Sequence, residues 1–271
     1  MTATEKNGQN QLSGALLIVL HLLPGIIFAV TFLVLSMMFI QHGLTGYLAL
    51  LITIPACLVP IEIGVLLFWS KRFPGSISLS DVIGYRQKGT VVEYVVLPLL
   101  LFICWGVLST VISPLSQYLE VHLSDFLPAW VNQEALINGL ISRSPAQRSI
   151  IQFLAILLSG FVVPIVEELY FRGFLLPRME HWGWAAPVVN SFLFAVYHFY
   201  FPGTVVGIFV AFLPISYIVM VKKNWKIGAI THSMFNLGEC FRCLHSYQRR
   251  PDTMDRAART RGEQSGAACR N

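Results

Sequence analysis

Charged side chains are scarce in this sequence of 271 residues: Asp, Glu, Lys and Arg make up 12% of the chain, whereas they make up about 25% of a typical soluble domain. Hydrophobic residues make up 55%, and the mean hydropathy is +0.64. This composition excludes an ordinary soluble globular domain, because too few polar side chains remain to cover its surface. The chain is therefore predicted to be a polytopic membrane protein.

Alternating patterns of apolar and polar residues, which would indicate membrane β-strands, are also absent. Within lipid only helices and closed barrels pair all of their backbone groups, so the expected class is all-α. The net charge is a modest +5, and the six arginines in residues 245–271 supply much of it. A charge of this size does not indicate nucleic-acid binding, and we expect the lipid bilayer, but no nucleic acid, as a partner.

Cysteine is sparse, with five residues in the chain. Cys57 and Cys104 lie inside apolar runs, where cysteine behaves as a small hydrophobic residue. Cys240 and Cys243 form one C-x-x-C pair, and a second pair would be needed to indicate a zinc or redox site. The cysteines are therefore interpreted as having no chemical role.

Long apolar runs dominate the sequence, and a run of about 18 apolar residues is enough to predict a membrane-spanning helix. Six runs qualify: Leu12–Ile40, Leu44–Trp69, Val91–Ile112, Ser149–Phe174, Trp184–Phe201 and Thr204–Val221. The first run exceeds the core of a cleavable signal and lacks a basic segment before it, so a retained helix is expected. A seventh stretch, Trp225–Phe241, is shorter and is interrupted by Glu239.

These runs predict a bundle of about six to eight transmembrane helices in one domain, residues 12–244, with the motif-bearing part at residues 149–240. Residues 1–11 are polar, and residues 245–271 are polar and poor in aromatic side chains. Both ends have the composition of segments that cannot bury enough apolar surface to fold, so both are expected to be disordered.

The orientation follows from the distribution of basic residues, which are enriched in cytoplasmic loops. The loop between the second and third runs carries Lys71, Arg72, Arg86 and Lys88 against Asp81, whereas residues 113–148 carry three acidic residues against two arginines. We therefore expect a multi-pass protein of the plasma membrane with a cytoplasmic N-terminus. The arginine-rich tail would then lie outside if residues 225–241 cross completely, and a re-entrant last segment is the alternative.

The most unusual stretch is Val163–Gly173, which places Glu167, Glu168 and Arg172 inside an apolar run. Ionisable groups inside the membrane are costly, and they are usually paired and functional. Glu168 and Arg172 are four residues apart, so they share a helix face and can pair. Glu167 projects elsewhere without a partner in its own segment, which makes it a candidate general base.

Two further helices carry polar side chains at helical spacing. Asn190, Phe194 and His198 share one stripe of the fifth run, and His232 and Asn236 lie one turn apart in the last stretch. Each pattern alone is compatible with ordinary hydrogen bonds between membrane helices. Together with Glu167 they supply a base, a proton carrier and two donors for an oxyanion.

The depths of these residues permit convergence. With a rise of 1.5 Å per residue, Glu167 and His198 lie about 20 and 27 Å from a turn near residue 180, a difference that helix tilt can absorb. By the same rise His232 lies only about 12 Å beyond the turn at Lys222, so that turn must be sunk in the membrane or its helix tilted.

The ordered motifs Glu167-Glu168-x-x-x-Arg172, Phe194-x-x-x-His198 and His232-x-x-x-Asn236 resemble those of the CAAX prenyl protease and bacteriocin-processing family, the intramembrane glutamic proteases related to type II CAAX endopeptidases. The resemblance covers about residues 149–240. It implies an all-helical membrane fold with a polar catalytic cavity that opens toward the cytosol, and a peptide or lipidated protein, such as a prenylated one, as substrate.

The resemblance also implies the role of each side chain. Glu167 activates water with help from His198, His232 and Asn236 stabilise the oxyanion, and Glu168, Arg172 and Phe194 support the site. After Asn236 the sequence departs from the family pattern, because Glu239, Arg242 and a polar tail follow where a longer apolar helix is expected.

Three alternatives remain at this stage. The first is a metal-dependent protease, since His198, His232 and a glutamate could bind zinc; the sequence lacks H-E-x-x-H, however, and we expect no metal or other cofactor. The second is a non-catalytic immunity or scaffolding protein of the same fold, which would not need an unpaired intramembrane glutamate. The third is a transporter with Glu167 as a proton relay, for which inverted repeats would be expected.

Overall fold

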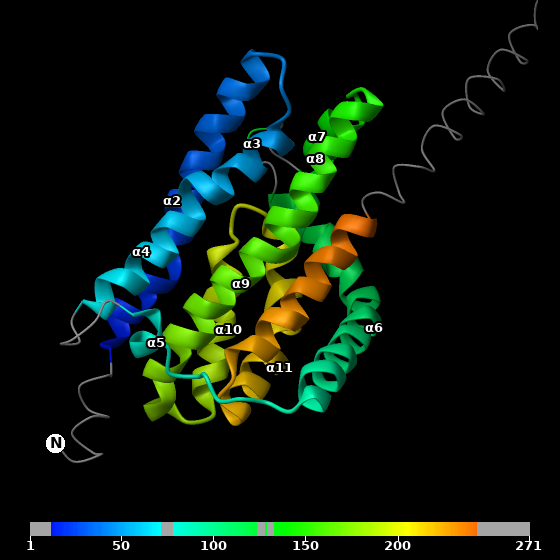
Figure 1. Cartoon of the computed structure of the whole chain (residues 1–271). Coiled ribbons are helices and arrows are strands. Elements are labelled where there is room, and N and C mark those ends of the chain that lie inside the picture. Colours follow the sequence, from blue (N-terminus) through cyan, green and yellow to red (C-terminus); the bar gives the residue numbers. More distant parts are fainter. Residues whose placement is uncertain (1–11, 72–77, 124–127, 129–132, 243–271) are drawn as a thin grey trace, which may run out of the picture.

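The computed structural model describes residues 12–71, 78–123, 128 and 133–242, and over these residues the chain is an all-helical bundle without a strand (Figure 1). Its elements are α2 (Gly14–Gln41), α3 (Gly46–Thr53), η1 (Ile54–Leu58), α4 (Val59–Ser70), α5 (Leu79–Val82), α6 (Val91–Leu123), α7 (Gln133–Ile141), α8 (Pro145–Leu157), η4 (Leu158–Val162), α9 (Val163–Glu167), η5 (Glu168–Leu175), η6 (Leu176–Trp182), α10 (Ala185–Tyr197), η7 (Pro202–Thr204) and α11 (Val205–Lys222). Residues 225–242 form one more helix. The predicted tails, 1–11 and 245–271, lie outside the described residues.

Five helical stretches are long and apolar enough to cross a membrane: Gly14–Gln41, Gly46–Ser70, Val91–Leu123, Pro145–Trp182 and Pro202–Lys222. Each coincides with one of the predicted runs, and the all-α membrane bundle is thereby confirmed. The fifth predicted run, Trp184–Phe201, was too long, because the helix Ala185–Tyr197 ends where the His198 amide bonds back to the Ala195 carbonyl.

The third span was predicted too short. Helix α6 continues past Ile112 to Leu123 although Pro114 lies inside it, so residues 113–148 are not a single connection. Proline removes one backbone donor, and membrane helices tolerate that loss without ending. The next helices, α7 and α8, are separated by the three residues 142–144. Helix α8 begins with a capping box formed by Ser144 and Gln147.

The last helix, residues 225–242, runs without interruption beside the middle of the bundle, where Figure 1 draws it in orange. Its length is about 27 Å at 1.5 Å per residue, which is close to the thickness of the bilayer core. Lys223, in the left-handed conformation with φ of 49°, reverses the chain between α11 and this helix. This length is compatible with a complete crossing, but the helix is not among the five stretches that are long and apolar enough to span a membrane, so the re-entrant alternative stays a prediction beside it.

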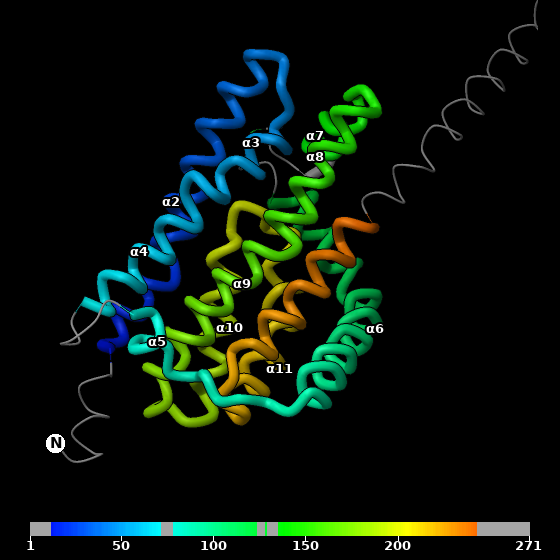
Figure 2. The backbone as a smooth tube through the Cα atoms, viewed as in Figure 1, coloured from blue at the N-terminus to red at the C-terminus, as the bar shows by residue number. Residues whose placement is uncertain are grey.

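One end of the bundle is closed by the segment at residues 83–89, which we call the connecting segment. Figure 2 shows it passing along this end from α5 toward α6. Its backbone bonds to two distant parts of the chain: Gly84 donates to the carbonyl of Gly173 in η5 at 2.9 Å, and Gln87 donates to the Lys223 carbonyl at 2.8 Å. Trp225 donates to the Tyr85 carbonyl at 3.0 Å.

Basic side chains gather at the same end, which we call the basic end (residues 71, 83–89, 178–184 and 222–226). Lys222 pairs with Glu93 at 2.6 Å, and Lys223 pairs with Glu180 at 2.8 Å. Arg178 donates to the carbonyls of Val82 and Phe174. These bonds fasten α6, η6 and α11 together, so the end that was predicted to be cytoplasmic is closed by polar contacts.

Candidate active site

The helix with the two glutamates is locally widened. It contains two π-helical segments, η4 just before α9 and η5, which begins at Glu168 and includes Arg172. Such i→i+5 segments are rare and are often found at functional sites. Because a π-helix turns less per residue than an α-helix, the neighbouring Glu167 and Glu168 point less far apart than the predicted α-helix would place them. Both are buried, at 1% and 0% exposure.

Glu168 and Arg172 form the predicted pair, with 3.0 Å between Oε1 and Nη1 and no exposure of either side chain. The Arg172 Nε donates to the Ser216 hydroxyl at 3.3 Å. Its guanidinium lies over the rings of Phe194 and Phe212, 4.1 and 4.9 Å from their centroids. Such ring faces attract a cation, so Phe194 supports the site through Arg172.

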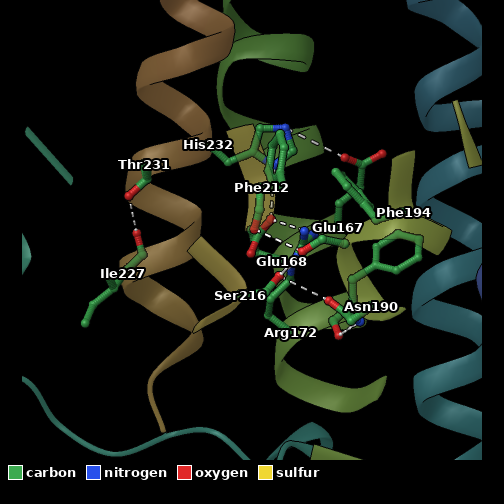
Figure 3. A network of polar contacts seen from close by, with 12 residues as sticks. Glu167, Glu168, Arg172, Asn190, Phe194, Phe212, Ser216, Ile227, Thr231 and His232 are labelled. Carbon is green, nitrogen blue, oxygen red and sulfur yellow. Dashed lines mark hydrogen bonds and ion pairs between the residues drawn. The ribbon is translucent and has the colours of Figure 1, made fainter. Parts of the chain in front are cut away.

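His232 lies between the two carboxylates (Figure 3). Its Nδ1 is 3.3 Å from Glu168 Oε1, and its Nε2 is 3.8 Å from Glu167 Oε2. Gly228, one turn earlier on the same helix, allows this approach, because a Cβ there would collide with Glu168 Oε2. The sequence-based expectation that the two glutamates act separately is thus modified: one imidazole contacts both.

His198 approaches Glu167 from the end of α10. Its Nδ1 is 2.9 Å from the Phe194 carbonyl, to which it donates, and Nε2 is therefore the atom that faces Glu167 Oε1, at 4.0 Å. The ring is held edge-on by Phe194, with the centroids 4.9 Å apart. With 17% of its side chain exposed, His198 is more open than Glu167 or His232.

Asn236 lies one turn beyond His232, but it is turned toward the helix of the glutamates at another level. Its Nδ2 donates to the Ser159 carbonyl at 2.7 Å. A carboxamide nitrogen carries two hydrogens, so one donor remains for another acceptor. Ser159 lies in η4, where the π-helical geometry changes the usual backbone partner of its carbonyl. The Asn236 side chain supplies a donor to that carbonyl.

Asn190 was predicted to share a polar stripe with His198, yet its hydrogen-bond partners are His21, Phe171 and Ser216 and not Glu167. Its Nδ2 donates to the Phe171 carbonyl and to His21 Nε2, both at 3.1 Å. Its Oδ1 accepts from the Ser216 hydroxyl at 3.4 Å. Asn190 therefore joins α10 to its neighbours and does not contact the carboxylate that the catalytic prediction depends on.

Sequence reasoning missed five side chains that contact this cluster or its supports: His21, Glu62, Tyr197, Phe212 and Ser216. Glu62 and His21 are ionisable groups inside predicted spans, and the rule that singled out Glu167 applies equally to them. Phe212 and Ser216 are common residues in apolar helices, and nothing in the sequence distinguishes them from their neighbours.

A cavity of about 400 Å³ lies beside Asn236, one turn along the last helix from His232. Ser159 and Asn236 line it together with Tyr47, Leu136, Phe201 and Glu239. These residues place it toward the end of the bundle formed by residues 42–45, 141–144, 202–204 and 239–242, which we call the cavity end. Arg143 fastens this end by donating to the Gly43 carbonyl at 2.6 Å.

The cavity end lies opposite the basic end. The expected cytoplasmic basic loops and the cytosolic opening implied by the family resemblance therefore point to different ends of the same bundle. As for metals, no group of three or more His, Cys, Asp or Glu side chains in the described parts of the chain has the arrangement of a shared metal site.

Residues 149–238 match a family model described as type II CAAX prenyl endopeptidase Rce1-like. The matched region contains the widened helix with Glu167, Glu168 and Arg172, all of α10 and α11, and the last helix as far as Gly238, including His232 and Asn236. No curated protein and no solved structure gives a significant match. Over residues 149–238 the chain is thus similar to type II CAAX prenyl endopeptidases, and its five long apolar helices are those of an integral membrane protein.

Proposed function

We propose that this protein is an intramembrane endopeptidase that hydrolyses a peptide bond of a membrane-associated or lipidated protein, with Glu167 as the base that activates water. The observation that carries the proposal is the position of Glu167: a buried carboxylate lies 3.8 and 4.0 Å from the Nε2 atoms of His232 and His198. Its Oε2 has no hydrogen-bond partner among the described residues, so it is available to a substrate water.

The proposed reaction uses these groups in turn. Glu167 removes a proton from water, and the water oxygen bonds to the carbonyl carbon of the substrate. The π electrons of the C=O bond move to the carbonyl oxygen, which becomes the oxyanion. His232 and the remaining donor of Asn236 stabilise this oxyanion, a type of interaction that commonly contributes a factor of about 10²–10³ per donor. The bond from carbon to nitrogen then breaks, and Glu167, assisted by His198, returns the proton to the leaving amine.

The cavity beside Asn236 suits the substrate side of this reaction. Most of its surface is apolar, and its polar lining residues are Ser159, Thr204, Asn236, Glu239 and Arg242. Sites that bind ligands with an apolar body usually combine such surfaces. A lipidated or membrane-embedded peptide would bury its apolar part there and present one peptide bond to Glu167. The family match supports such a substrate class at the family level.

The test is a comparison of membrane peptides released in cells that carry the wild-type protein or the Glu167→Gln variant. Loss of an essential base commonly costs a factor of about 10²–10⁴, while the shape of the side chain is kept. Glu180→Gln, which changes an exposed glutamate at the basic end, is the matched control. Full proteolysis by Glu167→Gln would refute the proposed role of this residue.

The same assay on purified protein decides between the glutamic and the metal-dependent mechanism. We propose that no cofactor takes part, so cleavage should persist after treatment with EDTA or phenanthroline. Loss of cleavage that zinc restores would instead assign His198, His232 and a glutamate to a metal.

We also propose that the N-terminus and the basic end are cytoplasmic in the plasma membrane, since basic loops are retained there. With this orientation the cavity opens on the other side of the membrane, in contrast to the opening that the family resemblance implies. In a variant without native cysteines, Ser142→Cys should react with an impermeant thiol reagent in intact cells, and Gln87→Cys should react only after permeabilisation. The reverse pattern would invert the topology and give the cavity access to the cytosol.

A further inference from the structure

A third buried carboxylate lies next to the cluster, on a helix outside the matched domain. Glu62 of α4 is fully buried, and its Oε1 accepts a hydrogen bond from the Tyr197 hydroxyl at 3.3 Å. Its Oε2 has no hydrogen-bond partner, and none of the ion pairs in the described parts of the chain includes Glu62. An ionisable side chain placed without a cation inside a membrane helix is costly, which favours a role for it.

Tyr197, the partner of Glu62, is the residue before His198 and is itself fully buried. Its ring packs edge-on against the imidazole of His198, with the centroids 4.8 Å apart, and against Phe171 at 5.2 Å. Gly25 of α2 makes room for it, because a Cβ at Gly25 would lie 2.5 Å from the Tyr197 carbonyl oxygen and 2.6 Å from its ring. The ring is therefore fixed, and its hydroxyl has few directions available.

The Tyr197 side chain also interacts with Glu167. A phenol has one hydrogen to donate, so it serves one carboxylate at a time. While Glu62 accepts that hydrogen, the Glu167 carboxylate is left to water. Without Glu62 the hydroxyl would turn to Glu167, which would reduce its ability to remove a proton, and the ring against His198 would shift with it.

We propose that Glu62 is a positioning residue that acts through Tyr197: by accepting the hydroxyl hydrogen it holds the Tyr197 ring against His198 and withholds that hydrogen from Glu167. The proposal rests on the proposed function, because it concerns the base of that reaction. It adds α4 to the site, although α4 precedes the matched region of residues 149–238.

The test is a double-mutant cycle on the purified full-length protein, with kcat, KM and melting temperature measured for each variant. Glu62→Met should lower kcat by about tenfold with KM nearly unchanged, in line with the coupling found between contacting residues. Glu62→Gln keeps an acceptor oxygen and should retain most of kcat. In a Tyr197→Phe background no hydroxyl remains to be controlled, so Glu62→Met should cause no further loss of kcat.

Leu66→Met, a change of similar volume one turn along α4, controls for altered packing and should leave kcat unchanged. The positioning role is refuted if Glu62→Met keeps wild-type kcat, or if the losses from Glu62→Met and Tyr197→Phe multiply. If Glu62→Met fails to fold, Glu62→Gln and Tyr197→Phe decide: the proposal requires kcat to be kept by the first and lowered by the second. These outcomes differ from failure of the proposed function, which would appear as full activity of Glu167→Gln.

Discussion

The stretch Pro145–Trp182 and helix α6 are almost equally apolar, but they occupy opposite environments. Their most apolar windows have mean hydropathies of 2.3 and 2.5, yet 33% of the first window is buried inside the protein and only 6% of the second. In Figure 1, α6 lies at one side of the bundle, whereas α9 lies in its middle. Hydropathy therefore reports that a helix can enter lipid, and not whether it faces lipid once there.

What separates the two stretches is the placement of charged groups. Glu167, Glu168 and Arg172 lie in the interior part of the first stretch, and all are buried. On α6, Glu93 lies in the first turn and pairs with Lys222, and large side chains such as Val107 and Val111 are exposed. Buried charge thus marks the helix that the bundle is built around, and exposed valine marks the one that lipid covers.

The largest effect on stability is expected from removing the buried ion pair of the first stretch. Glu168→Gln leaves the guanidinium of Arg172 without its charged partner in the interior, and breaking such a pair costs about 3–5 kcal/mol. We expect low abundance and a lower melting temperature in detergent. Activity per folded molecule should fall as well, because Glu168 Oε1 also lies 3.3 Å from His232.

Glu93→Gln on α6 is the matched control, since it removes a carboxylate from an exposed pair. It should leave the melting temperature almost unchanged, because exposed pairs are screened by solvent. Equal destabilisation by the two variants would contradict the comparison.

A smaller effect is expected from adding one methyl group to a glycine. At Gly228 a Cβ would collide with Glu168 Oε2 and lie 3.2 Å from Val219 Cγ2, so Gly228→Ala should destabilise the protein by the about 1–3 kcal/mol typical of overpacking. At Gly106 of α6 a Cβ would meet nothing within 4 Å. Gly106→Ala should therefore be neutral or stabilising by up to about 1 kcal/mol, the helix preference of alanine over glycine. Thermal unfolding of both variants measures the difference, and a stabilised Gly228→Ala would show that the two helices are not packed this closely.

The smallest effect is expected on the outer face of α6. Val107→Leu changes a side chain that is 64% exposed, and such substitutions usually stay within about ±0.5 kcal/mol. Unfolding and proteolysis should both match the wild type. A clear loss of stability would show that this face is covered by another protein surface and not by lipid.

The helical class and five of the spans followed from apolar run length alone, because a backbone in lipid has few other ways to pair its polar groups. Helix ends were less predictable. The end of α10 depends on the turn at His198, and the continuation of α6 through Pro114 depends on how little one missing donor costs a membrane helix. Neither has a clear signal in hydropathy.

The candidate site was predictable where it depends on spacing and unpredictable where it depends on packing between helices. The spacing of four residues gave the pair of Glu168 and Arg172, and the catalytic roles of Glu167, His198, His232 and Asn236 stay predictions. The π-helical widening at Glu168, by contrast, has no recognised sequence pattern. The engagement of Asn236 by Ser159 and the approach of α4 could be seen only once the helices were placed.

The connecting segment at residues 83–89 sets when the fold can be completed as the chain is synthesised. Ribosomes deliver this segment well before Gly173, Lys223 and Trp225, the residues to which its backbone bonds. The last of these bonds, from Trp225 to the Tyr85 carbonyl, can close only when the final helix has begun to be synthesised, and that helix also brings His232 beside Glu167. The nascent chain therefore lacks part of its proposed catalytic group until nearly all of it has entered the membrane, and the same last step completes the closed end and the site.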